Sequence, residues 1–344
     1  MLSRLWPRLT AKSRFASELK TASLADLESA HFLLFSRPMS KAERASYGAR
    51  LKKRPLRFEE LAEELLHSPE FAGRFGTLIR SVEDDVVEVT VDEVAIFLRR
   101  SDRLISGPVL AGHPHEPQVW ASLAPLLLPG TTFVDIGANV GLFALPAARR
   151  VGSGRVIAVE PVADNVQLLC ASIARNDFRN LEVMPFAASD HHGVIAVVGR
   201  QETTNSFTPP DRAVRPGAPC APCAPMDALL LSRGRIDLVK IDVEGHEPAV
   251  LAGARELLAR DRPTLLVEFN PFGLHANFGQ EPLRLADWLL DYADDVAVIV
   301  RDGPPIPCRS GAEILRAWEA ANARLALDGR LHVDVLAKAR RDRP

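Results

Sequence analysis

The chain has 344 residues, of which 47% are hydrophobic and 25% charged, and its formal net charge is -2 at pH 7. This is the composition of an ordinary soluble chain that contains one large domain and something smaller. No run of about 18 apolar residues occurs and the first residues lack the apolar centre of a signal peptide, so we expect no membrane span, no secretion and a cytoplasmic location.

The first 80 residues form a basic segment. They contain 15 Lys/Arg and 9 Asp/Glu, a balance of +6, which leaves -8 for the remainder. Helical periodicity between Leu24 and Phe75 is broken at Arg37-Pro38 and Arg54-Pro55, which predicts about three short helices. The basic residues are scattered and no nucleic-acid motif accompanies them, so we expect no nucleic-acid partner. We predict a small all-α module over residues 1–80 that docks to a partner.

This module has a resemblance of its own. Residues 32–71, which close with Ser68-Pro-Glu-Phe71, resemble a small helical domain of unknown function found in bacterial adhesins and beside glycosyltransferases. The tryptophan often found near the middle of that domain is absent here. Alternating apolar residues over 82–104 then predict a strand pair, within a strand-rich connector over residues 81–113.

A glycine turn follows the next predicted elements, a helix over Glu116–Leu127 and a buried strand over Thr131–Ile136. The segment Gly137-Ala-Asn-Val-Gly141 is typical of a turn in which backbone approaches a ligand, and a helix over Leu142–Arg150 follows it. Glu160 ends the next apolar strand, where a carboxylate accepts hydrogen bonds from the two hydroxyls of a ribose. The pattern therefore predicts a cofactor that contains adenosine.

The glycine spacing distinguishes between adenosine cofactors. A dinucleotide fingerprint has G-x-G-x-x-G, but Asn139 and Leu142 stand at the second and third glycine positions. Asp135 places an anion close to where a pyrophosphate would lie, which repels phosphate and suits a cation. S-adenosylmethionine is such a cation, so we expect it as the cofactor. An NAD-dependent oxidoreductase remains the alternative enzyme, and a non-catalytic binding module with this fold is a third hypothesis.

A second motif, Ile236-Asp-Leu-Val-Lys-Ile-Asp-Val-Glu-Gly-His-Glu-Pro248, is an apolar strand followed by acids and a predicted helix over Ala249–Leu258. Acids at the carboxyl end of a strand lie where open α/β sheets bind ligands. A hydroxyl acceptor must lose a proton, and the candidates to remove it are Asp242, Glu244, His246 and Glu268. His246 has the most suitable ordinary pKa, near 6.5. Alternatively His246 satisfies a helix start, Asp242 faces the methionine end of the cofactor and Glu244 organises the turn.

The remaining segments complete an alternation of strands and helices, which predicts a parallel, doubly wound sheet. We expect a helix over Asp164–Asn176 and a strand over Leu181–Ala188, and after the strand that ends near Glu268 a helix over Leu283–Tyr292 and strands over Val296–Val300 and Leu331–Ala337. The proline-rich segment Gly199–Pro225 reads as a surface loop or as a substrate lid with Asn205 and Ser206 as contacts. It contains the pair Cys220 and Cys223, for which we expect no metal.

Four of these motifs together resemble the FkbM family of S-adenosylmethionine-dependent methyltransferases. They are Val-Asp-Ile-Gly-Ala-Asn-Val-Gly, Val-Glu-Pro, Leu-Val-Lys-Ile-Asp-Val-Glu-Gly-His-Glu and Leu-Leu-Val-Glu-Phe, in matching order and spacing, and the resemblance covers residues 114–337, including His115-Glu-Pro117. It implies a class I methyltransferase sheet with a terminal antiparallel hairpin over 114–344, and O-methylation of a hydroxyl on a glycan or related natural product. A metal-assisted variant through Asp242, Glu268 and Asn270 does not match the usual spacing of such ligands.

The site residues follow from the motifs and from the strand order 3-2-1-4-5 that this fold implies. Asn165, Ser189 and Asp190 are expected to flank the adenine. The full expected cofactor set is Asp135, Gly137, Asn139, Gly141, Glu160, Asn165, Ser189, Asp190 and Asp242.

Overall fold

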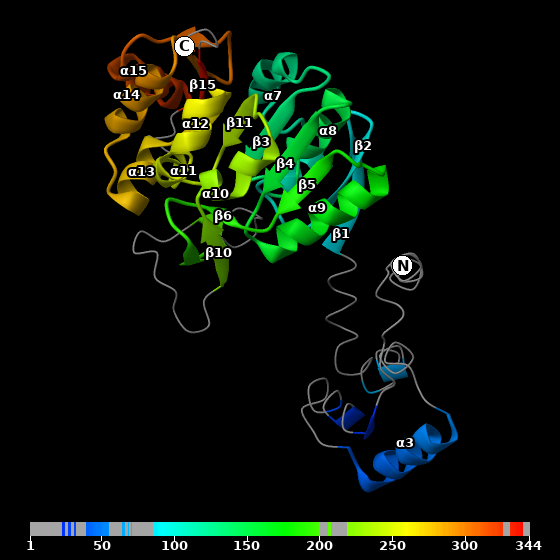
Figure 1. Cartoon of the computed structure of the whole chain (residues 1–344). Coiled ribbons are helices and arrows are strands. Elements are labelled where there is room, and N and C mark those ends of the chain that lie inside the picture. Colours follow the sequence, from blue (N-terminus) through cyan, green and yellow to red (C-terminus); the bar gives the residue numbers. More distant parts are fainter. Residues whose placement is uncertain are drawn as a thin grey trace. The chain divides into compact units, whose positions relative to one another are not determined.

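The computed structural model describes residues 85–199, 206–207, 219–325 and 331–339, and before them residues 23–24, 27–28, 31, 39–54, 64–65, 68 and 70. The chain separates into two compact units, Met1–Asp85 and Val86–Pro344, which Figure 1 draws. Within the described part of the chain, no helix combines the length and the apolar character needed to cross a membrane.

The first unit contains the helix α3 (Lys41–Lys53). Ser40 begins it with a capping box, in which the Ser40 side chain accepts from the Glu43 N–H and the Glu43 carboxylate accepts from the Ser40 N–H. Leu27 and Leu65 form a small buried cluster in this unit. The other expected helices and most of the resemblance over 32–71 lie outside the described residues.

The second unit begins with a β-hairpin of β1 (Val86–Val91) and β2 (Val94–Arg99), as the alternation predicts. The side chain of Asn176 accepts from the Ala95 N–H at 2.9 Å and donates to the Ala95 carbonyl at 2.7 Å. Ser172 Oγ accepts from the Phe97 N–H at 3.0 Å. These bonds join the hairpin to the helix that carries Asn176, so it belongs to the second unit, and the boundary between the units lies at 85/86.

An eight-stranded sheet organises the second unit. Its order is β14-β13-β15-β12-β11-β3-β4-β5. The bounds are β3 (Thr132–Ile136), β4 (Arg155–Val159), β5 (Leu181–Met184), β11 (Leu238–Ile241), β12 (Thr264–Phe269), β13 (Asp295–Ile299), β14 (Ile306–Pro307) and β15 (Val333–Lys338). Neighbours from β5 to β12 pair in parallel, and β15 pairs antiparallel with both β12 and β13. The predicted class I methyltransferase sheet, with its 3-2-1-4-5 core and antiparallel end, is confirmed.

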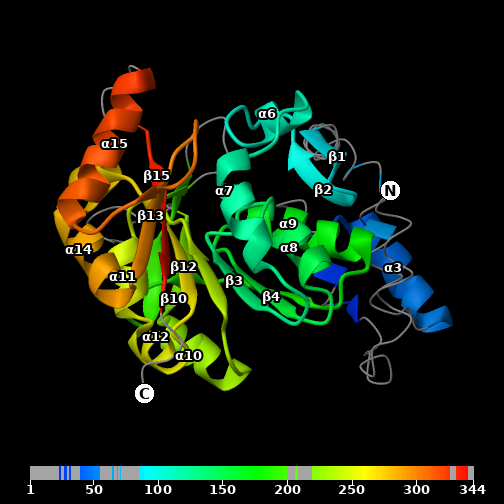
Figure 2. The ribbon, with the colours of Figure 1, turned by 90° about the horizontal axis from the view of Figure 1, so that it is seen from above.

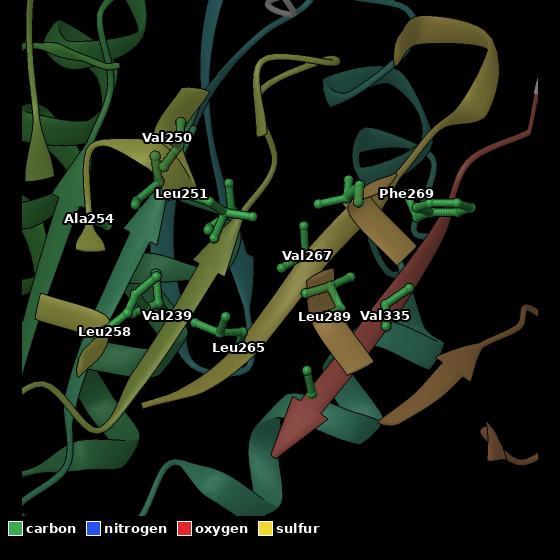
Figure 3. Close-up of a cluster of buried hydrophobic side chains, with 14 of the residues drawn as sticks. Val239, Val250, Leu251, Ala254, Leu258, Leu265, Val267, Phe269, Leu289 and Val335 are labelled. Carbon is green, nitrogen blue, oxygen red and sulfur yellow. The ribbon is translucent and has the colours of Figure 1, made fainter. Parts of the chain in front are cut away.

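Helices cover both faces of this sheet, as Figure 2 shows from above. One face carries the hairpin with α6 (Ser106–Leu110), α7 (Pro117–Leu123), α8 (Ala144–Val151) and α9 (Ala163–Asn176). The other carries α10 (Met226–Leu230), α11 (Glu247–Ala252), α12 (Arg255–Asp261), α13 (Pro271–Phe278), α14 (Pro282–Tyr292) and α15 (Gly311–Leu325). Figure 3 shows how side chains of α11 and α12 meet those of β11 and β12 in the second core. Two buried hydrophobic cores, one on each face of the sheet, therefore hold the strand ends rigidly.

The expected third strand, Leu181–Ala188, is interrupted. Pro185 follows β5, and since proline has no N–H to donate, the ladder stops there. The chain resumes as β6 (Ala187–Ala188), which joins β10 (Cys220–Ala224) and β7 (Gly193–Ala196) in a small separate sheet. The cysteine pair thus lies in a strand rather than in the expected loop, with Cys220 exposed and Cys223 buried.

The expected helix over Ala249–Leu258 is also interrupted, because α11 ends at Ala252 and α12 begins at Arg255. A Cβ on Gly253 would lie 1.9 Å from the carbonyl oxygen of Ser189, so the break lets two backbones touch. Asp227 starts the second helix by accepting from the N–H groups of Glu256 and Leu257 at 3.0 and 2.8 Å. A further short pair, β8 (Val198–Gly199) with β9 (Ser206–Phe207), borders the proposed lid, and Asn205 lies outside the described residues.

Candidate active site

A cavity of about 130 Å³ opens at the carboxyl ends of β3, β4, β11 and β12. This is the edge at which doubly wound sheets bind ligands, because the strand order reverses there. A larger cavity of about 470 Å³ lies between α11–α12 and α14, away from the acidic motifs. The polar residues that line the smaller cavity are His115, Glu116, Asn139, Glu160, Asn165, Lys240, Asp242, Glu244, His246, Glu268 and His332.

The turn after β3 is shaped by contacts inside the protein. Gly137 has a φ of +82°, and a Cβ there would lie 1.8 Å from the carbonyl oxygen of Asp242. A Cβ on Gly141 would overlap the side chains of Leu145 and Leu169. Gly137 lines the cavity but Gly141 does not. Both glycines therefore allow close packing within the protein, whereas the sequence suggested an approach of backbone to a ligand.

We expect Gly137→Ala to lower the free energy of unfolding by about 3 kcal/mol or more, because strain at positive φ adds to a collision between backbones. Gly130→Ala is the matched control, since Gly130 has a φ of +91° but nothing lies within 4 Å of its Cβ position. Strain alone should make that change cost about 1–2 kcal/mol. Equal losses in the two variants, measured by urea unfolding, would contradict the collision.

Glu160 is buried at the end of β4 and accepts three hydrogen bonds. Its donors are the N–H of Asn139 at 2.9 Å, the N–H of Val162 at 2.9 Å and the side-chain amide of Asn165 at 3.2 Å. Burial raises the pKa of Glu160 to about 7, although these bonds favour the ionised form. The strand end thus brings together three residues of the expected set, Asn139, Glu160 and Asn165.

Lys240 supplies a buried positive charge that the sequence analysis did not single out. Its Nζ lies 2.7 Å from Asp242 Oδ2 and 4.7 Å from the centre of the Phe143 ring. Asp135 lies on the adjacent strand β3, opposite Lys240 in the register, and is not on the cavity wall. Burial raises the pKa of Asp135 to about 6, against the pull of Lys240. The sequence feature that could have identified Lys240 is its position inside an otherwise apolar strand.

The turn after β11 is organised by Glu247. Its Oε1 accepts from the N–H groups of Val243 and Gly245, both at 3.1 Å, and its side chain is fully buried. The sequence analysis had offered this role to Glu244, which instead lines the cavity with a φ of +56°. The acids after β11 therefore divide into a structural one, Glu247, and two that line the cavity, Asp242 and Glu244.

His246 precedes α11 and lines the cavity, and only 3% of its surface is exposed. Its side chain makes no capping bond to the helix, which removes the reading of His246 as a helix cap. Its Nε2 lies 3.2 Å from Ser189 Oγ. Ser189 and Asp190 lie behind the cavity wall, and at this strand end Phe186, Ala187 and Ala188 line it instead. The expected contacts of Ser189 and Asp190 with adenine thus have no support from their placement.

A cluster of histidines and carboxylates lines another part of the cavity. His332 Nε2 lies 3.1 Å from Glu116 Oε1, its Nδ1 lies 3.5 Å from Glu268 Oε1, and His115 Nε2 lies 3.9 Å from Glu116 Oε2. His115, Glu116 and Glu268 fell within quoted motifs, but the sequence analysis gave none of His115, Glu116 and His332 a role. No local signal joins His332 to Glu116, since 216 positions separate them.

The charges in this cluster are unequal. Burial opposes the charge of His332, but its bond to Glu116 outweighs burial and raises the pKa of His332 to about 9. Burial likewise opposes the charge of Glu116, but the bond from His332 and the nearby positive charges lower its pKa to about 2. Burial and the neighbouring carboxylates raise the pKa of Glu268 well above its usual range. At neutral pH, Glu116 and His332 form an ion pair, whereas the environment of Glu268 favours its neutral form.

The metal-assisted alternative lacks a ligand set. Asn270 caps α13 by accepting from the Gly273 N–H at 3.0 Å, and it does not line the cavity. Nowhere in the described ranges do three or more His, Cys, Asp or Glu side chains gather in a way that would hold a metal ion.

Residues 135–296 match the model of the family described as the Methyltransferase FkbM domain. The resemblance to this family is thereby confirmed over that segment, which contains Glu160, Lys240, His246 and Glu268 but not Glu116 or His332. No curated protein matches the sequence.

Three solved structures illustrate what the chain is similar to. Methyltransferase FkbM from Methylobacillus flagellatus KT is 15% identical, with 86% of this chain and 71% of that chain covered and a TM-score of 0.41. A putative O-methyltransferase from Klebsiella pneumoniae is 14% identical, with 78% and 97% covered and a TM-score of 0.38. Fibrillarin from Aeropyrum pernix, solved with natively bound S-adenosyl-L-methionine, is 12% identical, with 73% and 82% covered and a TM-score of 0.36.

Proposed function

We propose that this protein is an S-adenosylmethionine-dependent methyltransferase that methylates a hydroxyl group of a glycan or a related natural product. The observation that carries the proposal is the cavity at the ends of β4, β11 and β12. Acidic side chains from these three strand ends line it, and the three strands lie within the segment that matches a methyltransferase family. The S-adenosylmethionine sulfonium supplies an activated methyl group when the cofactor is bound.

The residues present fit that cofactor. Glu160 accepts from backbone N–H groups at the tip of β4, in the place where a carboxylate meets ribose hydroxyls. Asp242 and Glu244 line the cavity with carboxylates that suit a cationic ligand. Phe186, with Ala187 and Ala188, offers an apolar wall for an adenine ring. Gly137 and Asn139 form the turn between these groups, on which the methionine part of the cofactor would lie.

The same cavity distinguishes between the candidate bases. Burial and the neighbouring carboxylates raise the pKa of Glu268 well above the usual range, which disfavours the ionised form that a base needs. Asp242 is engaged by Lys240 at 2.7 Å. With Glu244 assigned to the cationic cofactor, these two observations favour His246 among the four candidates as the base that takes the proton of the acceptor hydroxyl. Holding the hydroxyl in line with the methyl carbon supplies much of the acceleration.

The cluster of His115, Glu116, Glu268 and His332 supports a hydroxylated acceptor. It presents an anion, a cation and a second carboxyl group within one cavity, and a polyhydroxylated molecule both donates to and accepts from such groups. We therefore place the acceptor at this cluster. The basic first unit, with its balance of +6 over 80 residues, is proposed to dock an acidic partner.

Calorimetric titration of the purified protein with S-adenosylmethionine, S-adenosylhomocysteine and NAD, each in a separate run, tests the proposal. We expect S-adenosylmethionine and S-adenosylhomocysteine to bind with a Kd on the order of micromolar, because separate groups of the cavity would contact the ribose, the adenine ring and the positively charged part of the ligand. Binding of NAD alone would replace methyl transfer with hydride transfer. Binding of none of the three would make the chain a non-catalytic module.

A further inference from the structure

A fully buried serine joins the cavity to an aspartate and a histidine at the protein surface. Ser189 Oγ lies 3.2 Å from His246 Nε2, and the same oxygen lies 3.2 Å from Asp190 Oδ1 and 3.3 Å from His191 Nδ1. Ser189 and His246 are 0% and 3% exposed, whereas the side chains of Asp190 and His191 are 39% and 44% exposed. One hydroxyl thus separates a cavity residue from groups in contact with solvent.

The distances fit one set of donors and acceptors. His246 Nε2–H donates to Ser189 Oγ, Ser189 Oγ–H donates to Asp190 Oδ1, and His191 Nδ1–H donates to the same carboxylate oxygen at 2.8 Å. Cys223 Sγ lies 3.6 Å from His191 Nε2 on the far side of that ring. A hydroxyl both accepts and donates, which is what a group that passes protons along a chain must do.

Backbone packing fixes the serine in this position. The Ser189 N–H donates to the Ala224 carbonyl at 3.1 Å, which ties it to β10. The Ser189 carbonyl is in close contact with Gly253, at the break between α11 and α12. His246 stands at the start of α11, so the same break places the serine and the histidine side by side. The arrangement is set by the fold rather than by mobile surface side chains.

We propose that Ser189 carries to the surface the proton that His246 takes from the acceptor hydroxyl, an inference that rests on the proposed function. His246 gives its Nε2 proton to Ser189 Oγ while Ser189 gives its own hydroxyl proton to Asp190 Oδ1. One N–H and one O–H bond break, and two O–H bonds form. Water then removes the proton from Asp190. His246 is left neutral with the acceptor's proton on Nδ1, and exchange with water after product release returns it to the Nε2–H form for the next turnover. Ser189 is a positioning and relay residue, since it does not line the cavity.

Other titratable groups surround His246, and the test leaves them unchanged. Glu247 on its own turn is bonded to the N–H groups of Val243 and Gly245. Those that line the cavity with it are His115, Glu116, Glu160, Lys240, Asp242, Glu244, Glu268 and His332.

The experiment measures how fast the His246 imidazole N–H exchanges with water. The full-length protein is labelled with ¹⁵N-histidine and saturated with S-adenosylhomocysteine, which fills the cavity. We expect Ser189→Ala to slow this exchange by about tenfold or more, because the hydroxyl that joins His246 to solvent is gone. Ser189→Thr retains a hydroxyl and should restore most of the rate. Asp190→Asn, at the exposed end of the chain of bonds, should also slow it.

Ser172→Ala is the matched control, because Ser172 is 0% exposed and bonded to Phe97 on the hairpin. In this variant the His246 imidazole N–H should exchange with water at the wild-type rate. An unchanged rate in Ser189→Ala, or an equal loss in Ser189→Ala and Ser189→Thr, would overturn the relay. If Ser189→Ala does not fold, an unchanged rate in Asp190→Asn overturns it instead. If S-adenosylhomocysteine does not bind the wild type, the proposed function fails, while the rates in ligand-free protein still test the relay.

Discussion

Glu160→Gln should weaken S-adenosylhomocysteine binding by about 10- to 100-fold, because the carboxylate is the group that accepts from the ribose hydroxyls and each charge-assisted bond contributes about 1.5–3 kcal/mol. An amide can accept through only one oxygen, whereas Glu160 accepts through both, from Asn139 on Oε2 and from Val162 and Asn165 on Oε1. The substitution therefore places an N–H against an N–H at the tip of β4. Isothermal titration calorimetry of both proteins measures the change.

The same residue predicts how affinity depends on pH. Burial raises the pKa of Glu160 to about 7, so the ionised form that binds ribose is lost as the pH falls through 7. Wild-type affinity for S-adenosylhomocysteine should therefore rise between pH 6 and pH 8, and this rise should be much smaller in Glu160→Gln. If the affinities of the two proteins changed with pH in the same way, Glu160 would not be the residue that binds the ribose.

Asp261→Asn provides the control for the loss of a buried carboxylate. Asp261 is 5% exposed, accepts from the Ile236 N–H at 2.8 Å and pairs with Arg260 at 2.7 Å. It lies near the start of β11, at the opposite edge of the sheet from the cavity. The variant should lose stability and keep its affinity, whereas Glu160→Gln loses affinity. A loss of affinity in both would indicate a general effect of instability.

Lys240→Met should lower the free energy of unfolding by about 3–5 kcal/mol, because it removes one partner of a buried ion pair and leaves the other uncompensated. Lys240 is 1% exposed, and its removal leaves Asp135 and Asp242 together at the end of β11 and β3. Burial opposes the charge of Lys240, but Asp242 and Asp135 outweigh burial and raise its pKa. Lys240 is therefore charged in both the folded and the unfolded chain at every pH well below about 10, the ordinary lysine value, so its own titration causes no change of stability in that range.

The loss in Lys240→Met should be larger at pH 8 than at pH 5. Asp135 already has a pKa of about 6, and removal of the lysine charge raises it further, so the folded variant must hold a proton that the unfolded chain releases. Its stability consequently falls as the pH rises. Urea unfolding at the two pH values, followed by tryptophan fluorescence, gives the comparison.

Lys338→Met is the matched control on the surface of the same sheet. Lys338 ends β15 and pairs with Asp295 at 3.3 Å, with 45% of its side chain exposed. Exposed pairs contribute little, so the expected change is below about 1 kcal/mol at either pH. A similar small loss in Lys240→Met would mean that the buried carboxylates are neutralised without the lysine.

The fold of the second unit could be predicted because its signals are local. Four of the five strands of the 3-2-1-4-5 core, β3, β4, β11 and β12, are short apolar runs with a glycine or an acid at or near their ends, and a helix follows each of them. Three polar residues of the cavity wall, Asn139, Glu160 and Asn165, could be identified in the same way, since each lies in a turn or helix start directly after a strand. Residues that are close together along the chain can be recognised from such short-range sequence patterns.

The sequence by itself thus determined the fold class, the strand ends and the residues at the tips of β3, β4 and β11. Tertiary structure alone decided which buried charges face each other. His332 and Glu116 meet because β15 inserts beside β12, Lys240 opposes Asp135 because β11 pairs with β3, and Ser189 reaches His246 through the break at Gly253. The physical reason is that strand order and register bring together segments far apart in the chain, and their electrostatic interactions depend on distance in space rather than in sequence.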